Sequence, residues 1–284
     1  MELIYYRGLN CHLASLINIA AVMGINYDAA YATLWSETDF YKDREHHLFT
    51  SKRVIENLES LGLKWNRIDT AASENESECL AATAVNELLF VGMDTFYIPW
   101  NHLYGNFHET HYFYACKDSA DACTCFDPTY HIINQPLSLS YLAEYAFELC
   151  SVRKQAGSGL STDLSREADM ILQTHPEIRS IICSKILSCA DLTDRDFKEL
   201  IQLVTAMINN RYLFDRYLRY SAEERKDHRQ YFKPGFLSGW EAVKNGLYKA
   251  YIVKNKDRTA AETAKLFEQQ MAEETMIAEA IKRS

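Results

Sequence analysis

The spacing of apolar residues early in the chain changes from helical to strand-like. Residues 11–23 carry apolar side chains at helical spacing and Gly24 follows as a stop signal, so we expect a helix there. Shorter helical patterns occur at 27–36 and 51–61. A continuous apolar run at 87–94 is then typical of a buried strand.

Two segments rich in aromatic residues follow that run. Residues 110–118 and 122–130 are separated by a short polar turn, which predicts a β-hairpin. The segment before the hairpin, 95–109, is more apolar and aromatic than an ordinary surface connection. Because binding residues are frequently carried on loops, we expect this one to line a site.

Strand patterns nearly disappear after a stretch containing Gly and Ser at 154–163. Helical periodicity continues to the end of the chain, where Thr259 and Glu262 have the spacing of a capping box for a last helix. The pattern therefore predicts an α+β protein. We expect a domain with an antiparallel sheet at 1–153 and an α-helical domain or cap at 154–284.

Charge and hydropathy narrow the possible partners. The formal net charge of −9 at pH 7 argues against a nucleic-acid partner. The N-terminus shows no signal-peptide pattern. The longest apolar run, 13–23, includes Ser15 and Asn18 and is too short to cross a bilayer. We therefore expect a cytoplasmic protein without a membrane or nucleic-acid partner.

The eight cysteines are expected to be reduced, because the chain shows no secretion signal. Cys123 and Cys125 form a Cys-x-Cys pair, but no second Cys or His pair stands at a spacing that would complete a tetrahedral site. Alternation along a strand explains the pair better, and no metal is expected. Cys11 is different because it starts the first predicted helix, where the dipole and the free N–H groups favour a thiolate. A buried, unreactive thiol is the alternative.

A nucleophilic cysteine needs a base, and the base needs a group that orients it. His111 stands at the start of a predicted strand, where its ring can be held rigidly. Asp127 stands at the end of the partner strand, so the hairpin can bring it beside His111 to fix the imidazole tautomer. The sequence therefore predicts Cys11, His111 and Asp127 as a triad.

Other histidines and acids compete for these roles. His12 follows the cysteine directly and points elsewhere on a helix, while His102 and His108 lie in the aromatic loop. Asp94 is an alternative orienter, although capping of the loop is its expected role. Taken singly, a strand histidine is most often structural, and an aspartate before proline most often forms a turn.

Four short motifs, in this order, resemble the BtrH-like family, which is named for a butirosin-biosynthesis protein. They are "NCHLASLINIAAVMG", "GMDTFYIPW", "THYFYA" and "FDP", and the resemblance covers roughly residues 1–150. It implies a papain-like, cysteine-protease-type fold for the N-terminal half. It also implies that Cys11 is the nucleophile, His111 the general base and acid, and Asp127 the orienter.

The oxyanion hole is less defined, because papain-like enzymes carry a Gln shortly before the cysteine and this sequence has none. Its candidate donors are the backbone N–H of the cysteine with a side chain from the preceding turn, either Asn10 or Arg7. Candidate substrate-lining residues are Tyr97, Trp100 and His108.

Members of this family are linked to acyl transfer from a carrier-protein thioester onto an amine in thiotemplated natural-product biosynthesis. The resemblance therefore implies an amide-forming acyltransferase whose partners are an acyl or peptidyl carrier protein and a small amine. No cofactor is expected on this chain, whereas phosphopantetheine is expected on the carrier. A cysteine hydrolase with the same fold (peptidase, amidase or thioesterase) remains open, as does a non-catalytic helper protein.

A locally basic stretch at 211–233 interrupts the acidic sequence. Because carrier proteins are usually acidic, Arg216, Arg219 and Arg225 are candidates for docking one. A solvated helix face with internal i,i+4 pairs is the alternative.

Overall fold

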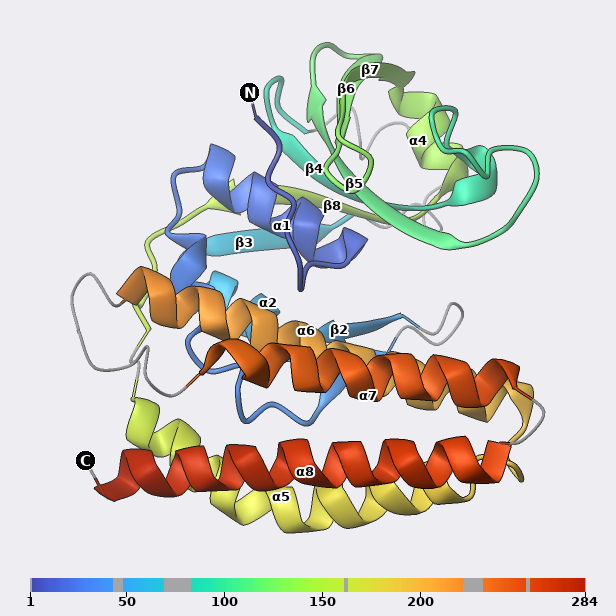
Figure 1. The fold of residues 1–284 in the computed structure, drawn as a ribbon. Coiled ribbons are helices and arrows are strands. Elements are labelled where there is room, and N and C mark those ends of the chain that lie inside the picture. The colour runs from blue at the N-terminus through green and yellow to red at the C-terminus, as the bar shows by residue number, and fades with distance from the viewer. Residues whose placement is uncertain are drawn as a thin grey trace. The chain divides into compact units, whose positions relative to one another are not determined.

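An antiparallel sheet and a group of long helices make up different parts of the chain, so the fold is α+β (Figure 1). The structure is a computed structural model that describes residues 2–42, 48–68, 83–160, 163–221, 232–253 and 256–283. The chain forms two compact units. We call Met1–Tyr27 with Ile55–Leu160 the sheet unit, and Asp28–Val54 with Ser161–Ser284 the helical unit.

A six-stranded sheet is the framework of the sheet unit, and all neighbouring strands are antiparallel. In spatial order the strands are β3 (Leu63–Arg67), β8 (Ala146–Lys154), β4 (Leu88–Asp94), β5 (Thr110–Lys117), β6 (Ala122–Asp127) and β7 (Ile132–Ser138). The predicted buried strand is β4, and the predicted hairpin is β5 with β6. Both predictions are confirmed, although β6 ends at Asp127 and a turn occupies 128–131.

Helix α1 (Cys11–Val22) begins at the predicted residue and ends one residue before the predicted end. The Asn10 side chain caps it by accepting a backbone N–H of the first turn at 2.9 Å. Gly24, with φ +64°, adopts the left-handed conformation that stops a helix. Asn18 bonds both backbone polar groups of Ile4, at 2.8 and 2.9 Å, which ties the N-terminal segment alongside the helix. The approach of the chain to its first helical residue is thereby fixed.

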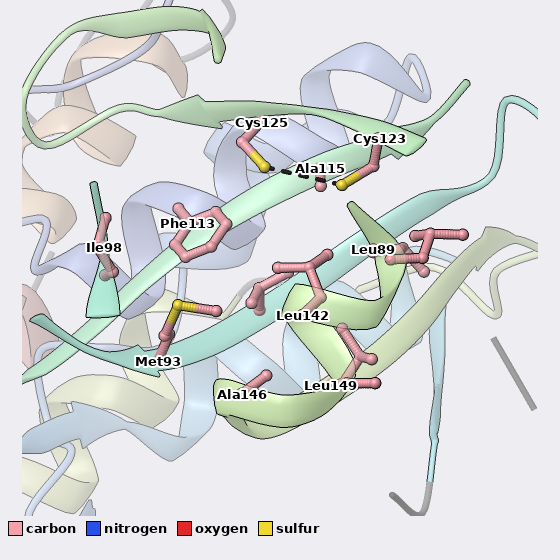
Figure 2. Packing of buried hydrophobic residues seen from close by; sticks show 13 residues of the cluster. Leu89, Met93, Ile98, Phe113, Ala115, Cys123, Cys125, Leu142, Ala146 and Leu149 are labelled. Carbon is pink, nitrogen blue, oxygen red and sulfur yellow. Dashed lines mark hydrogen bonds between the residues drawn. The ribbon is translucent and has the colours of Figure 1, made fainter. Parts of the chain in front are cut away.

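A hydrophobic core lies between β4, β5, β6, β8 and helix α4 (Leu139–Tyr145), as Figure 2 shows. Phe113 on β5 and both Cys123 and Cys125 on β6 point into it. The two sulfur atoms lie 3.9 Å apart. Strand alternation thus accounts for the Cys-x-Cys spacing, and every cysteine in the described part of the chain is free.

Four long helices make up most of the helical unit: α5 (Leu164–Leu187), α6 (Asp194–Ser221), α7 (Pro234–Ile252) and α8 (Lys256–Arg283). One buried side chain from each helix joins a polar cluster around Glu274. The Glu274 carboxylate accepts hydrogen bonds from Arg211 at 2.8 and 2.9 Å and from Trp240 at 3.0 Å, and it lies 3.1 Å from His175 Nε2. Because one carboxylate joins all four helices, the cluster fixes their register.

Residues 28–54 belong to the helical unit, although all six strands of the large sheet follow them in sequence. Glu37 accepts a hydrogen bond from Asn210 of α6 at 2.6 Å, and Glu167 of α5 accepts one from the backbone of Ser36 at 2.9 Å. These buried contacts hold the segment on the helices. The compact units divide between 160 and 161, with 28–54 in the helical unit, whereas the sequence predicted a single division between 153 and 154.

The same segment departs from its predicted secondary structure. The helix expected at 27–36 is only a 3₁₀ helix, η1 (Tyr27–Tyr31). A two-stranded sheet follows, formed by β1 (Phe40–Lys42) and β2 (Phe49–Ser51), which leads into α2 (Lys52–Ser60). In place of the expected helix after η1, the backbone forms short turns, closed by hydrogen bonds from Leu34 N–H to the Tyr31 carbonyl and from Glu37 N–H to the Leu34 carbonyl.

The predicted capping box at the last helix is wrong, because α8 begins at Lys256 and Thr259 is buried inside it. Glu262 instead pairs with Arg258 at 3.0 Å. Among the residues described, no helix has both the length and the apolar character needed to cross a membrane.

Candidate active site

Cys11 is the first residue of α1 and is half-buried. Its backbone N–H belongs to the first helical turn, where an α-helix provides no internal acceptor. The preceding turn contains Gly8 at φ +100° and closes with a hydrogen bond from Leu9 N–H to the Tyr6 carbonyl at 3.2 Å. The thiol is thus presented at the positive end of a helix dipole.

His111, the second residue of β5, is buried and has a partner on each side of its ring. Its Nε2 atom lies 2.8 Å from Oδ2 of Asp127. The Cys11 thiol faces the same imidazole closely enough for a side-chain hydrogen bond. Because Asp127 occupies Nε2, this second bond falls to Nδ1. The imidazole therefore stands between the thiol and the carboxylate, as the sequence predicts.

Asp127, the last residue of β6, is fully buried and satisfied by three donors. Its Oδ2 accepts hydrogen bonds from His111 and from the indole Nε1 of Trp100 at 3.0 Å. Its Oδ1 accepts the backbone N–H of Thr129 at 3.1 Å. The three donors fix the position of the buried carboxylate. Trp100, which the sequence suggested as a substrate-lining residue, therefore helps to hold Asp127 in place.

The electrostatics of His111 reflect both neighbours. Burial alone would lower the pKa of His111, but the hydrogen bonds and charges of Asp127 and Cys11 raise it to about 10. The imidazole is therefore protonated at neutral pH. The positive charge of the ring therefore lies beside the Cys11 side chain. A cysteine nucleophile needs an adjacent imidazole of this kind.

The competing histidines occupy other positions. His12 is buried against the rings of Phe90 and Tyr112, at 4.9 and 4.7 Å, and burial lowers its pKa to about 3. His108 is exposed and lies 2.8 Å from Asp94. Asp94 also caps the 3₁₀ helix η2 (Thr95–Tyr97), which is its expected role. Neither histidine replaces His111.

The remaining candidates separate into two groups. Asn10 uses its Oδ1 atom as the helix cap, and Arg7 is exposed in the turn before Cys11. Both stay candidates for the oxyanion hole. Tyr97, by contrast, stacks on Tyr145 at 4.4 Å and packs against the hydrophobic core, so its ring is committed elsewhere.

Two of the three arginines that are candidates for carrier docking, Arg216 and Arg219, lie on α6 in the helical unit. Arg216 pairs with Asp28 at 2.6 Å, and Arg219 makes an i,i+4 pair with Asp215 at 2.8 Å. Arg225 lies outside the described residues. The i,i+4 pair is the kind of contact expected for a solvated helix face.

Sequence patterns alone did not single out Tyr130. It stands in the turn after Asp127, and its ring lies 5.2 Å from the His111 ring and 5.5 Å from the His102 ring. The dipeptide Asp127-Pro128 was the available signal, because a turn there returns the next side chains toward the orienter. Within the described residues, no group of three or more His, Cys, Asp or Glu side chains is placed to hold a metal ion.

Comparison with known proteins finds no family model that matches this chain and no curated protein that qualifies as a relative.

Proposed function

We propose that this protein is a cysteine-dependent acyltransferase of papain-like fold that forms an amide through an acyl-Cys11 intermediate. The observation that carries the proposal is the meeting of Cys11, His111 and Asp127 from three separate elements. A thiol at a helix N-terminus, a buried imidazole and a buried carboxylate are the groups that acyl transfer needs.

In the first step, the Cys11 thiolate attacks the carbonyl carbon of an acyl thioester. The tetrahedral intermediate then collapses, the bond from that carbon to the donor sulfur breaks, and the imidazolium of His111 gives its proton to the departing thiolate. The products are the acyl-Cys11 thioester, neutral His111 and the free donor thiol. Because one thioester replaces another, the free-energy change of this step is small.

In the second step, an amine nitrogen attacks the acyl-Cys11 carbonyl and the carbon–sulfur bond to Cys11 breaks. His111 accepts the proton from the amine, so the thiolate and the imidazolium are restored together. Acylation has removed the thiolate charge that helps to raise the pKa of His111, so the ring is a better base at this stage. The same residue thus suits the acid role first and the base role second.

The choice of donor and acceptor rests on the family resemblance of the N-terminal motifs. A carrier-bound acyl group as donor and a small amine as acceptor are the partners that this resemblance implies. A hydrolase would use the same three side chains with water in place of the amine. A purely structural role for Cys11 is less favoured, because the thiol is half-buried and faces a protonated imidazole.

Intact-mass measurements with a panel of acyl-N-acetylcysteamine thioesters would test the proposal. We expect an acyl adduct that forms on wild-type protein and is absent from Cys11→Ala. Cys116→Ala is a matched control, because Cys116 is also a half-buried free cysteine. Adding amines should discharge the adduct as an amide.

Rapid discharge to the free acid, unchanged by any amine, would instead identify a hydrolase. Absence of an adduct with every donor, together with equal alkylation of Cys11 and Cys116, would leave only the structural role. A bound amine can outcompete water through positioning alone, which is worth on the order of 7 kcal/mol or more.

A further inference from the structure

The hydrogen bond between His111 and Asp127 does not by itself fix the plane of the imidazole. The contacts at Nε2 and Nδ1 lie on opposite sides of the ring, so the ring can still rotate about the line that joins the two nitrogen atoms. Trp100 and Thr129 restrain the carboxylate but not the ring. A further contact with the ring itself is therefore needed to fix the plane of the imidazole.

Tyr130 supplies that contact. Its ring lies 5.2 Å from the ring of His111 with an interplanar angle of 40°. On another side the same ring meets His102 edge-on, at 5.5 Å and 78°. Tyr130 therefore lies between the imidazole of the candidate triad and the aromatic loop at 95–109.

The backbone that carries Tyr130 is fixed by the residue that orients His111. Oδ1 of Asp127 accepts the N–H of Thr129 at 3.1 Å, and His131 N–H bonds the carbonyl of Pro128 at 3.4 Å. His131 has φ +54°, a left-handed conformation that closes the turn. One short turn thus carries both the carboxylate that bonds His111 Nε2 and the aromatic ring that packs at a tilt against the imidazole.

We propose that Tyr130 is a positioning residue, whose ring holds the His111 imidazole in the orientation that faces both Cys11 and Asp127. The ring also covers the imidazole, which strengthens its interaction with the buried carboxylate by excluding water. The titratable groups that shift the pKa of His111 are Asp127 from β6 and Cys11 from α1. Burial raises the pKa of Tyr130, so the phenol stays neutral and its charge does not perturb His111 near neutral pH.

The test measures the protonation of His111 in two ways. NMR titration reports on its imidazole, and the pH profile of alkylation with iodoacetamide reports on Cys11. Tyr130→Leu should lower the His111 midpoint by on the order of one pH unit and slow alkylation at pH 7 several-fold. Tyr130→Phe keeps the ring and should restore both. Tyr5→Leu is the control, because Tyr5 is affected by the charges of Cys11 and Asp127 but its ring contact is with His131.

An unchanged His111 midpoint in folded Tyr130→Leu would overturn the proposal. An equal shift in Tyr130→Phe would also overturn it, because the phenol rather than the ring would then be responsible. If Tyr130→Leu does not fold, Tyr130→Met retains bulk without a flat ring and should show the same downward shift; no shift there would equally refute the role.

The consequence for turnover rests on the proposed acyl transfer, but the titration needs no acyl donor. A shifted midpoint in a protein that accepts no thioester would uphold the role of Tyr130 and reject the acyltransferase. Acyl transfer with an unmoved midpoint would do the reverse.

Discussion

His111 and Asp127 meet through a contact of 2.8 Å between Nε2 and Oδ2, although they are 16 residues apart in sequence. The register of β5 and β6 explains the meeting. Tyr114 lies opposite Phe126, so continuation of the register places Phe113 opposite Asp127, with His111 two residues further on the same face. Diagonal neighbours of this kind are within reach of long side chains.

The raised pKa of His111 predicts a pH-dependent contribution to stability. Because the folded-state value of about 10 exceeds the ordinary 6.5, the contribution is fully present below pH 6.5 and is lost as pH rises through 10. Urea unfolding of wild type and His111→Gln, measured from pH 6 to pH 10, should therefore show a difference in unfolding free energy that shrinks with pH. A difference that stays constant over this range would mean that His111 is not protonated in the folded protein.

Asp127→Asn should lower the unfolding free energy, although the two side chains have nearly the same shape. Three N–H donors face the carboxylate, and an amide offers only one oxygen, so at least one donor must face an NH₂ group. We expect a loss of about 1–3 kcal/mol in unfolding free energy and a lower pKa of His111. Asp121→Asn, at an exposed position, is the control. Equal stability of the two variants in denaturant titrations would contradict the prediction.

Glu274→Gln should destabilise the helical unit by about 3–5 kcal/mol, because Arg211 would stay buried without its counter-charge. Burial by itself would raise the pKa of Glu274, but Arg211 and His175 lower it to about 2. Its contribution is therefore present above pH 4.5 and is lost as pH falls through 2. Thermal unfolding at pH 7 and in acid would show both effects.

The matched control for that variant is Glu279→Gln on the same helix, because Glu279 is exposed and makes only a surface pair with Arg283. A change of at most about 0.5 kcal/mol is expected there. If both variants lose the same stability, the buried cluster does not hold the helices together.

The carrier-docking hypothesis predicts a difference between two acyl donors. Arg219→Glu with Arg225→Glu should slow acylation by a carrier-bound thioester and weaken its salt dependence, while a small thioester mimic reacts as before. Arg216→Glu is expected to slow acylation by both donors, because Arg216 also pairs with Asp28 within the helical unit. If the double variant reacts with the carrier-bound thioester as fast as wild type, Arg219 and Arg225 do not dock the carrier.

The sequence by itself determined the local elements and the order of the chemical groups. Apolar spacing and Gly24 set the limits of α1, and a polar turn between aromatic segments indicated the β5–β6 hairpin. These features depend on neighbouring residues, so a periodic pattern is sufficient to predict them. The predicted juxtaposition of His111 with Asp127 followed from the hairpin for the same reason.

Tertiary structure decided the contacts between segments far apart in the chain. The sequence has no periodic pattern that would predict three of these contacts. They are the bond from Trp100 to Asp127, the packing of Tyr130 on His111 and the attachment of 28–54 to α5 and α6. The Glu274 cluster likewise needs four helices in register before any of its hydrogen bonds can form. Local propensity does not predict such contacts, because they stabilise the protein only when distant segments pack together and bury the polar groups.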